Sequence, residues 1–441
     1  MAETHSYYWQ QPLAARPAGT AGSANDSALG MAFRSVLFVA VLLCVWTSFN
    51  PFASADQVFI VSDAGSNITQ TGYSVMFVIL AAWCFGHQPL RMLVLVRPIL
   101  ILALLWCVVS VVTSWEPALS GRRFLYALVM VGIAGMMLLV PKDKRHFADL
   151  MGIVALLLMA ASYVGVALLP SLSIHQASDI IEPELAGDWR GIFGHKNGAS
   201  AAMVVFVFSG LMLRSLGRRA VGLLIIALAL PFLWFTHSRT ALAELPLVVV
   251  ISIFAKATRN PVIGIALTLA TILGLNLVAI GSIYSPTLHS LLQDLYIDPT
   301  FTGRTDIWRF IIAHIAERPT TGYGFSTFWM TEHVVYGFKD MGWVSSVSSG
   351  HNGYLDIALQ VGIPGAFLMI LWLVVAPLVD FYRVSYVPAN DPVKLFFFRL
   401  LLFAALESCF ESSFLLVNAF LVFLVWAGFS LRYMSRLPLA A

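Results

Sequence analysis

The sequence has 441 residues, of which 59% are hydrophobic and 11% are charged, and its mean hydropathy is +0.83. Soluble domains carry charge on about a quarter of their residues, so this composition excludes a soluble enzyme and indicates a polytopic membrane protein. The net charge of +3 is small and its basic residues are scattered, which excludes a nucleic-acid-binding surface.

The chain divides into a polar start, two groups of apolar runs and one long polar stretch between them. Residues 1–32 are polar and rich in Ala, Gly and Ser, which predicts a disordered cytoplasmic tail. Residues 33–283 hold nine apolar runs, 284–352 form a large loop with short amphipathic helices, and 353–441 hold three more runs and a short tail.

A membrane-spanning helix needs about 20 apolar residues. The runs therefore predict an all-α polytopic membrane protein with about twelve transmembrane helices. The expected spans are 33–52, 72–90, 94–114, 123–141, 149–170, 197–216, 219–236, 241–257, 260–283, 353–380, 396–412 and 414–434.

Basic residues in the short loops predict the orientation, because cytoplasmic loops are enriched in Lys and Arg. With the amino terminus inside, every inner loop carries such residues, and the 284–352 loop faces outward. Arg190, Lys196, Arg239, Arg304 and Arg318 then lie outside against the rule. Anion binding is a reason to keep them there; the alternative is that outer loops tolerate some arginines.

The segment Arg190-Gly-Ile-Phe-Gly-His-Lys-Asn-Gly stands where an outer loop enters the sixth span. A helix starting near Asn197 would present free N–H groups to an anion, and Arg190 and Lys196 would add charge. We therefore predict substrate binding by Arg190, His195, Lys196 and Asn197. The alternative is a glycine-rich entry turn built for close helix packing.

His237-Ser238-Arg239-Thr240 links two spans with almost no loop, so we expect Arg239 at the membrane face, directed into a cavity, and predict it as a catalytic residue. Glu244 follows within an apolar run, where an ionisable residue indicates function or pairing, and we predict it as a substrate-binding residue. A structural pair between Arg239 and either Glu244 or Glu411 remains the alternative.

Thr305 is positioned to cap a helix starting at Asp306 and ending before Pro319. This helix is expected on the membrane surface or over the spans. It would direct Arg304 at whatever lies beneath, and we predict Arg304 as a catalytic residue. Arg318 and Tyr323, at and after its end, are further candidate substrate-binding residues.

His351 and Asn352 close the loop just before the tenth span. Histidine is suited to accepting a proton near neutral pH, and Asp356 could orient it. We predict His351 as a catalytic base and Asn352 as a substrate-binding residue, although a lone histidine is more often structural.

Several established motifs are missing. The sequence has no D-x-D metal clamp, no P-loop, no G-x-G-x-x-G after a strand and no H-E-x-x-H. The four cysteines lie inside apolar runs without C-x-x-C spacing. We therefore expect no metal and no cofactor.

Four motifs in this order resemble the O-antigen ligase and Wzy polymerase superfamily, and most of all ExoQ-like exopolysaccharide polymerases of the succinoglycan type. They are R-G-x-x-G-H-K-N, H-S-R-T-A, T-G-R-T-D-x-W with G-Y-G-F, and H-N-G-Y-L-x-x-x-L-Q-x-G-I-P-G, between about residues 190 and 365.

The resemblance implies a GT-C-type glycosyltransferase of the bacterial inner membrane, with its site facing the periplasm. Its donor and acceptor would be undecaprenyl-diphosphate-linked oligosaccharides, and a chain-length-regulating copolymerase and a flippase would be partners. It implies that Arg190, Lys196, Arg239 and Arg304 hold the diphosphate and that His351 activates the acceptor hydroxyl. Inversion at the anomeric carbon is expected.

Three functions fit the sequence to different degrees. We favour a polymerase that moves the glycan onto another lipid-linked repeat unit. A ligase that uses a different acceptor has the same donor site. A transporter of an anionic glycolipid would also explain intramembrane charges, but the chain shows no internal repeat.

Overall fold

The computed structural model of the chain describes residues 28–53, 67–180, 182–258, 260–301, 303–338, 341–344, 347–384, 391–412, 414 and 419–437. Most of the predicted tail, residues 1–27, lies outside the described residues, and residues 28–32 already belong to the first helix. Within the described part the fold is all-helical without β-strands, and a single isolated bridge joins Ile174 to Trp189. The predicted all-α membrane fold is confirmed.

A helix stands at each predicted span. In chain order these are α1 (Ala28–Thr47), α2 (Asn67–His87), α4 (Pro98–Val112), α5 (Pro117–Met137), α6 (Lys144–Leu168), α8 (Lys196–Ser215), α9 (Arg219–Phe235), α10 (Arg239–Ala257), α11 (Pro261–Gly281), α15 (Gly353–Ile370) continued through the π-helical η5 (Leu371–Val375) into α16 (Ala376–Arg383), α17 (Asp391–Glu407) and α18 (Ala419–Arg436). Short helices complete the described chain: α3 (Pro89–Leu93), α7 (Pro170–Ser173), η2 (Pro183–Leu185), α12 (Pro286–Asp294), α13 (Arg304–Glu317) and α14 (Glu332–Gly337).

Within the described residues, eight of these helices are long and apolar enough to cross a membrane. The apolar helices α4 and α9 are shorter, with 15 and 17 residues. At 1.5 Å per residue, α4 rises about 22 Å, less than the roughly 30 Å hydrocarbon core. The eight longer apolar helices make the chain a multi-pass membrane protein.

The helix starts follow from local sequence. Proline occupies the first turn of α4, α5, α11 and α12, where its missing N–H costs nothing. Asp143 caps α6 by accepting from the amides of Arg145 and His146, and Asn260 caps α11 by accepting from Val262. These caps satisfy amides that a helix start otherwise leaves free.

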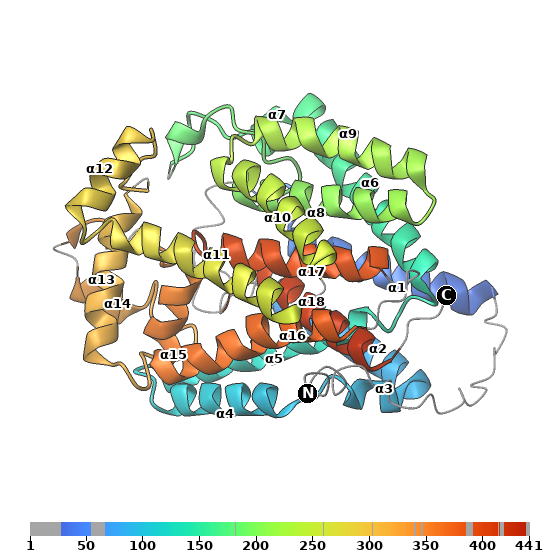
Figure 1. The fold of residues 1–441 in the computed structure, drawn as a ribbon, viewed down its shortest axis with the longest axis horizontal. Coiled ribbons are helices and arrows are strands. Elements are labelled where there is room, and N and C mark those ends of the chain that lie inside the picture. Colours follow the sequence, from blue (N-terminus) through green and yellow to red (C-terminus); the bar gives the residue numbers. More distant parts are fainter. Residues whose placement is uncertain are drawn as a thin grey trace, which may run out of the picture.

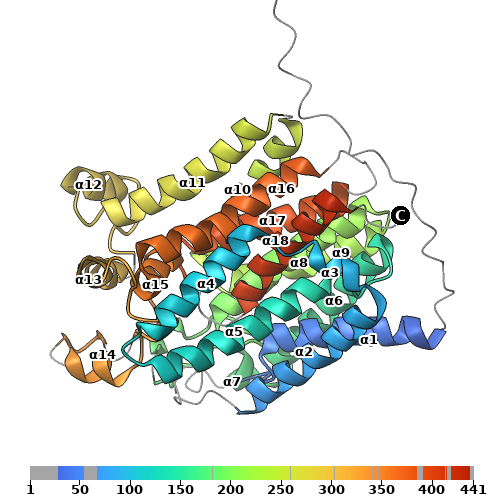
Figure 2. The same ribbon diagram turned by 90° about the horizontal axis from the view of Figure 1, so that it is seen from below.

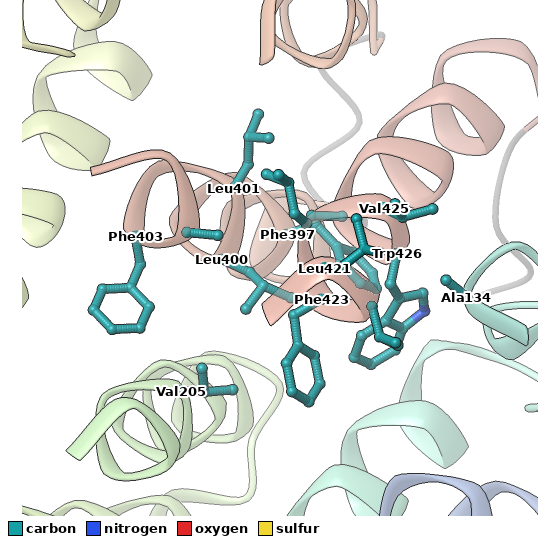
Figure 3. Close-up of a cluster of buried hydrophobic side chains, with 14 of the residues drawn as sticks. Ala134, Val205, Phe397, Leu400, Leu401, Phe403, Leu421, Phe423, Val425 and Trp426 are labelled. Carbon is teal, nitrogen blue, oxygen red and sulfur yellow. The ribbon is translucent and has the colours of Figure 1, made fainter. Parts of the chain in front are cut away.

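Helices α17 and α18 form the centre of the molecule, between α5, α8, α10 and α16. Figure 3 shows Trp426 of α18 directed toward Ala134 of α5, and Phe403 and Phe423 directed toward α8, which carries Val205. These side chains are buried. Because lipid is as apolar as the core, such dense packing rather than water exclusion holds the helices together.

The long loop, residues 282–352, carries α12, α13 and α14, which gather at one end of the helical body, on the left in Figures 1 and 2. Helix α13 packs on α15. The predicted amphipathic helix is confirmed, but its predicted cap is wrong: α13 begins at Arg304, Thr305 lies inside it, and Gly303 with a φ of 82° is the N-cap residue.

The long loop is hydrogen-bonded to α15 at the point where that helix is interrupted. Gly362 has a φ of 73° and Pro364 follows, so the helical hydrogen-bond ladder is interrupted there. The loop backbone takes its place: Ile363 N donates to Pro319 O at 2.8 Å, Tyr323 N to Leu359 O at 3.1 Å and Gly324 N to Gln360 O at 2.9 Å.

Candidate functional site

The carboxylate of Glu411 lies where four segments meet. Arg304 Nη2 donates to Glu411 Oε1 at 2.7 Å, and Asn197 Nδ2 donates to the same oxygen at 3.1 Å. His351 Nδ1 lies 3.2 Å from Glu411 Oε2. Three residues singled out from the sequence are thus brought together by a carboxylate in the short segment after α17.

Each of these side chains is positioned by the end of a helix. Arg304 opens α13, and its Nη1 also donates to the Phe410 carbonyl. Asn197 lies in the first turn of α8. His351 directly precedes the N-cap residue of α15, and Gly353 N donates to Ser408 O and Glu411 O at 2.7 and 3.1 Å. The start of α15 is therefore fixed against the segment that carries Glu411.

His351 has features of a functional residue. Its φ of 47° lies in the left-handed region, which costs energy for a residue with a side chain. A carboxylate can only accept, so Nδ1 carries the proton shared with Glu411, and Nε2 is left as the acceptor. The side chain is 33% exposed, so the ring is partly accessible to a ligand.

The charge state of Glu411 follows from its neighbours. Burial would raise the pKa of its carboxyl, but the positive charge of Arg304 and the hydrogen bond from His351 outweigh it and lower the pKa to about 2. Glu411 is therefore ionised across the physiological range and stabilises positive charge on His351.

Asp356 does not orient His351, contrary to the sequence-based prediction. Its carboxylate accepts from Trp329 Nε1 at 2.6 Å and from Gly350 N at 3.1 Å, and it is only 3% exposed. It anchors the end of the long loop to α15. The orienting carboxylate, Glu411, is 60 residues beyond His351 in the sequence.

A second carboxylate, Asp188, joins the two outer turns predicted from sequence. Lys196 Nζ lies 2.5 Å from Asp188 Oδ2, and His237 Nδ1 lies 2.6 Å from Asp188 Oδ1. The segment that begins at Arg190 and the turn before Arg239 are therefore neighbours, and Asp188 compensates much of the charge of Lys196.

His195 caps α8 and borders the same region. Its Nδ1 accepts from the Asn197 amide at 3.2 Å, so Nε2 donates to Glu182 Oε2 at 2.9 Å. Burial would raise the pKa of the Glu182 carboxyl, but hydrogen bonding to His195 and the nearby histidines hold it below its ordinary value. Burial, with His195 and Arg190 nearby, lowers the pKa of His175.

Arg239 is exposed at the first position of α10. Among the described residues it forms neither a hydrogen bond nor an ion pair, so the alternative pairs with Glu244 and Glu411 are not formed. The N-cap residue Ser238 makes no side-chain cap. The free guanidinium and the uncapped amides of α10 therefore remain available to an anion.

Arg190 and Asn352 have internal contacts instead. The Arg190 guanidinium is 1% exposed and donates to Ala53 O at 2.5 Å and to Gly194 O at 3.1 Å. Asn352 is fully buried and donates to Asn276 Oδ1 and Cys409 O, both at 2.9 Å. Both residues hold the segments around the site in place and are not presented to a ligand.

Three other candidates lie away from Glu411 or beneath it. Arg318 and Tyr323 lie at the other end of α13, which at 1.5 Å per residue is about 20 Å long. Arg318 stacks on the Tyr323 ring at 5.1 Å. Glu244 is buried inside α10, next to Glu407 of α17. The structure does not bring these residues to His351.

Sequence reasoning missed Glu411 as the central carboxylate. The available signal was the pair Glu407 and Glu411, four residues apart in an otherwise apolar run, because ionisable residues at membrane depth usually have a role. Among the described residues, no group of three or more His, Cys, Asp and Glu side chains has the arrangement of a metal site.

One comparison with known proteins found a match that covers part of the chain. No curated protein matches the chain. Residues 223–370 match the model of the family described as O-antigen ligase. The match runs from α9 through α15 and so includes Arg239, Arg304 and His351. Across residues 223–370 the chain thus carries a domain of the O-antigen ligase and Wzy superfamily, and this match supports glycan transfer in general.

Proposed function

We propose that the chain is a polysaccharide polymerase that transfers a glycan from a lipid diphosphate to a hydroxyl of another lipid-linked repeat unit. The observation that carries the proposal is His351: its ring is partly exposed, Nδ1 is held by Glu411, and Nε2 has no hydrogen-bond partner among the residues that the structure describes. This arrangement suits a general base for an attacking hydroxyl, and the family match supports glycan transfer.

In the proposed reaction, the acceptor hydroxyl gives its proton to His351 Nε2 and its oxygen attacks the anomeric carbon. The bond from that carbon to the diphosphate oxygen breaks, and the lipid diphosphate leaves with the electron pair. A single displacement inverts the anomeric carbon. Glu411 stabilises the imidazolium that forms, and Arg304 holds Glu411 in place.

The diphosphate needs positive charge that is not already compensated. Arg239 supplies it, because its guanidinium is exposed and unpaired within the described part of the chain. Lys196 contributes less, since Asp188 is bound to it. Arginine suits this task because its fork of N–H groups matches phosphate oxygens. We propose a metal-independent, GT-C-type enzyme using an undecaprenyl-diphosphate donor.

The site is proposed to face the periplasm of a bacterial inner membrane, with a flippase supplying substrate and a copolymerase setting chain length. The positive-inside pattern of the loops supports this orientation. We also propose that the protein is functionally similar to ExoQ-like exopolysaccharide polymerases.

A ligase is the second candidate function, because the matching family is described as O-antigen ligase. The purified protein in liposomes, supplied only with lipid-linked repeat units, separates the two. Polymer on the lipid identifies a polymerase. Transfer only after a different glycolipid acceptor is added identifies a ligase, and movement of intact glycolipid without a new glycosidic bond identifies a transporter.

The central test uses His351→Ala with His333→Ala as its matched control. His333 lies on the same loop but interacts with Glu116 and Trp115. General-base removal costs about 100- to 10,000-fold in rate, so His351→Ala is expected to accumulate unused repeat units, while His333→Ala polymerises normally. A normal rate for His351→Ala contradicts the proposed role. Chelator is expected to leave the rate unchanged.

A further inference from the structure

Two buried carboxyl groups lie below the site and take no part in the proposed reaction. Glu244 in α10 is 4% exposed and Glu407 at the end of α17 is 3% exposed, and the two lie side by side. Within the described residues, neither oxygen of Glu244 and not Oε2 of Glu407 has a hydrogen-bond partner. Buried polar groups nearly always have partners, so this pair requires an explanation.

The other titratable groups around the pair do not neutralise it. Tyr354 of α15 and Cys409 face Glu244, but the Tyr354 hydroxyl donates to Ala405 O at 2.8 Å and Cys409 Sγ to Ile272 O at 3.8 Å. Arg304 lies within range of Glu407.

The guanidinium of Arg304 is already bound to Glu411 and to the Phe410 carbonyl. Two adjacent buried carboxylates without a counter-ion repel each other and lose their hydration. Protonation of both carboxyl groups removes both costs, and the acid O–H of one can then donate to an oxygen of the other.

The pair is directly connected to the site. Glu411 follows Glu407 by four residues, and its amide donates to the Glu407 carbonyl at 2.8 Å. A negative charge on Glu407 would therefore compete with Glu411 for Arg304. It would also add repulsion against an anionic diphosphate at the same end of the helices.

We propose that Glu244 and Glu407 stay protonated at neutral pH and act as positioning residues, so that Glu411 is the charged carboxylate of the three. The protonation state is a property of the folded protein and does not depend on the reaction it catalyses. The effect on rate rests on the proposed function. At alkaline pH the pair loses a proton, Arg304 is drawn from Glu411, and glycan transfer slows.

The protonation state is tested without any activity. In the infrared spectrum of the protein in lipid at neutral pH, carboxylic-acid C=O absorption is expected, and Glu244→Gln and Glu407→Gln should each reduce it by the contribution of one acid group. Loss of carboxylate bands instead, with no change in the acid band, overturns the proposal. This result stands whichever reaction the protein catalyses.

The positioning role is tested by the pH profile of glycan transfer. A neutral amide replaces a neutral acid of the same shape, so Glu244→Gln/Glu407→Gln is expected to keep the neutral-pH rate within about threefold and to lose the alkaline decline. Glu317→Gln, at the far end of α13, is the control and should keep the wild-type profile. An unchanged profile in the double variant, or a folded but inactive double variant, overturns the role.

Discussion

The two ends of α13 each carry an arginine, but the two arginines have different interaction partners. At its start, Arg304 binds Glu411, and Glu411 also binds His351, whose other ring nitrogen has no partner within the described part of the chain. At its end, Arg318 stacks on Tyr323 and the Tyr323 hydroxyl donates to Glu317 at 2.8 Å. A basic residue on an outer loop therefore does not identify a site by itself. The first end is distinguished by His351, which has a strained backbone, a partly exposed ring and a second ring nitrogen that can still accept a hydrogen bond.

At the first end, a large loss of glycan transfer is expected for Glu411→Gln. The amide neither balances the charge of Arg304 nor stabilises the imidazolium of His351, so glycan transfer should fall about 100-fold, as expected when general-base catalysis is impaired. Single-turnover rates in liposomes measure it. Glu317→Gln makes the same change at the other end and should keep full activity; equal losses in both variants would remove the distinction between the ends.

At the second end, the break in α15 is expected to matter for folding. A Cβ on Gly362 would lie 2.0 Å from the Thr320 carbonyl oxygen, and its φ is 73°. Gly362→Ala should therefore lower the thermal stability, by about 1–3 kcal/mol from backbone strain alone. Gly274→Ala, which meets no atom within 4 Å, is the control. A Gly362→Ala protein as stable as wild type would show that stability does not depend on the hydrogen bonds between the long loop and α15.

The low pKa of Glu411, about 2 against an ordinary 4.5, predicts a pH-dependent stability. A carboxyl with a lowered pKa stabilises the fold fully above its unfolded-state pKa and loses that contribution as the pH falls through its folded-state pKa. The stability difference between wild type and Glu411→Gln should therefore be constant above about pH 4.5 and shrink toward pH 2. Thermal denaturation in detergent measures it, and a difference that grows on acidification contradicts the Arg304–Glu411 pair.

The smallest effect is expected for Arg318→Ala. Its stacking on Tyr323 is exposed, and such contacts contribute about 0.5–1 kcal/mol. The melting temperature should fall slightly while glycan transfer continues at the normal rate. Arg239→Ala is the comparison, because it should lose transfer at unchanged stability; similar kinetics for both arginine variants would show that their surroundings do not separate their roles.

The sequence determined the helical architecture because apolar runs of membrane length leave the backbone no choice but to satisfy its own hydrogen bonds. It also indicated the segments around Asn197, Arg239, Arg304 and His351, because charged and strained-turn residues stand out in such a background. The start of α13 differed by only two residues from its predicted position at Asp306.

Which of these residues work together was decided by tertiary structure. Asp356 is close to His351 in the sequence and Glu411 is distant. Packing of α15 against the end of α17 nevertheless brings His351 into hydrogen-bond distance of Glu411, while Asp356 accepts a hydrogen bond from Trp329. Local patterns fix helices because their hydrogen bonds are local. Partners across the bundle depend on helix packing and on the break at Gly362, which no short stretch of sequence encodes.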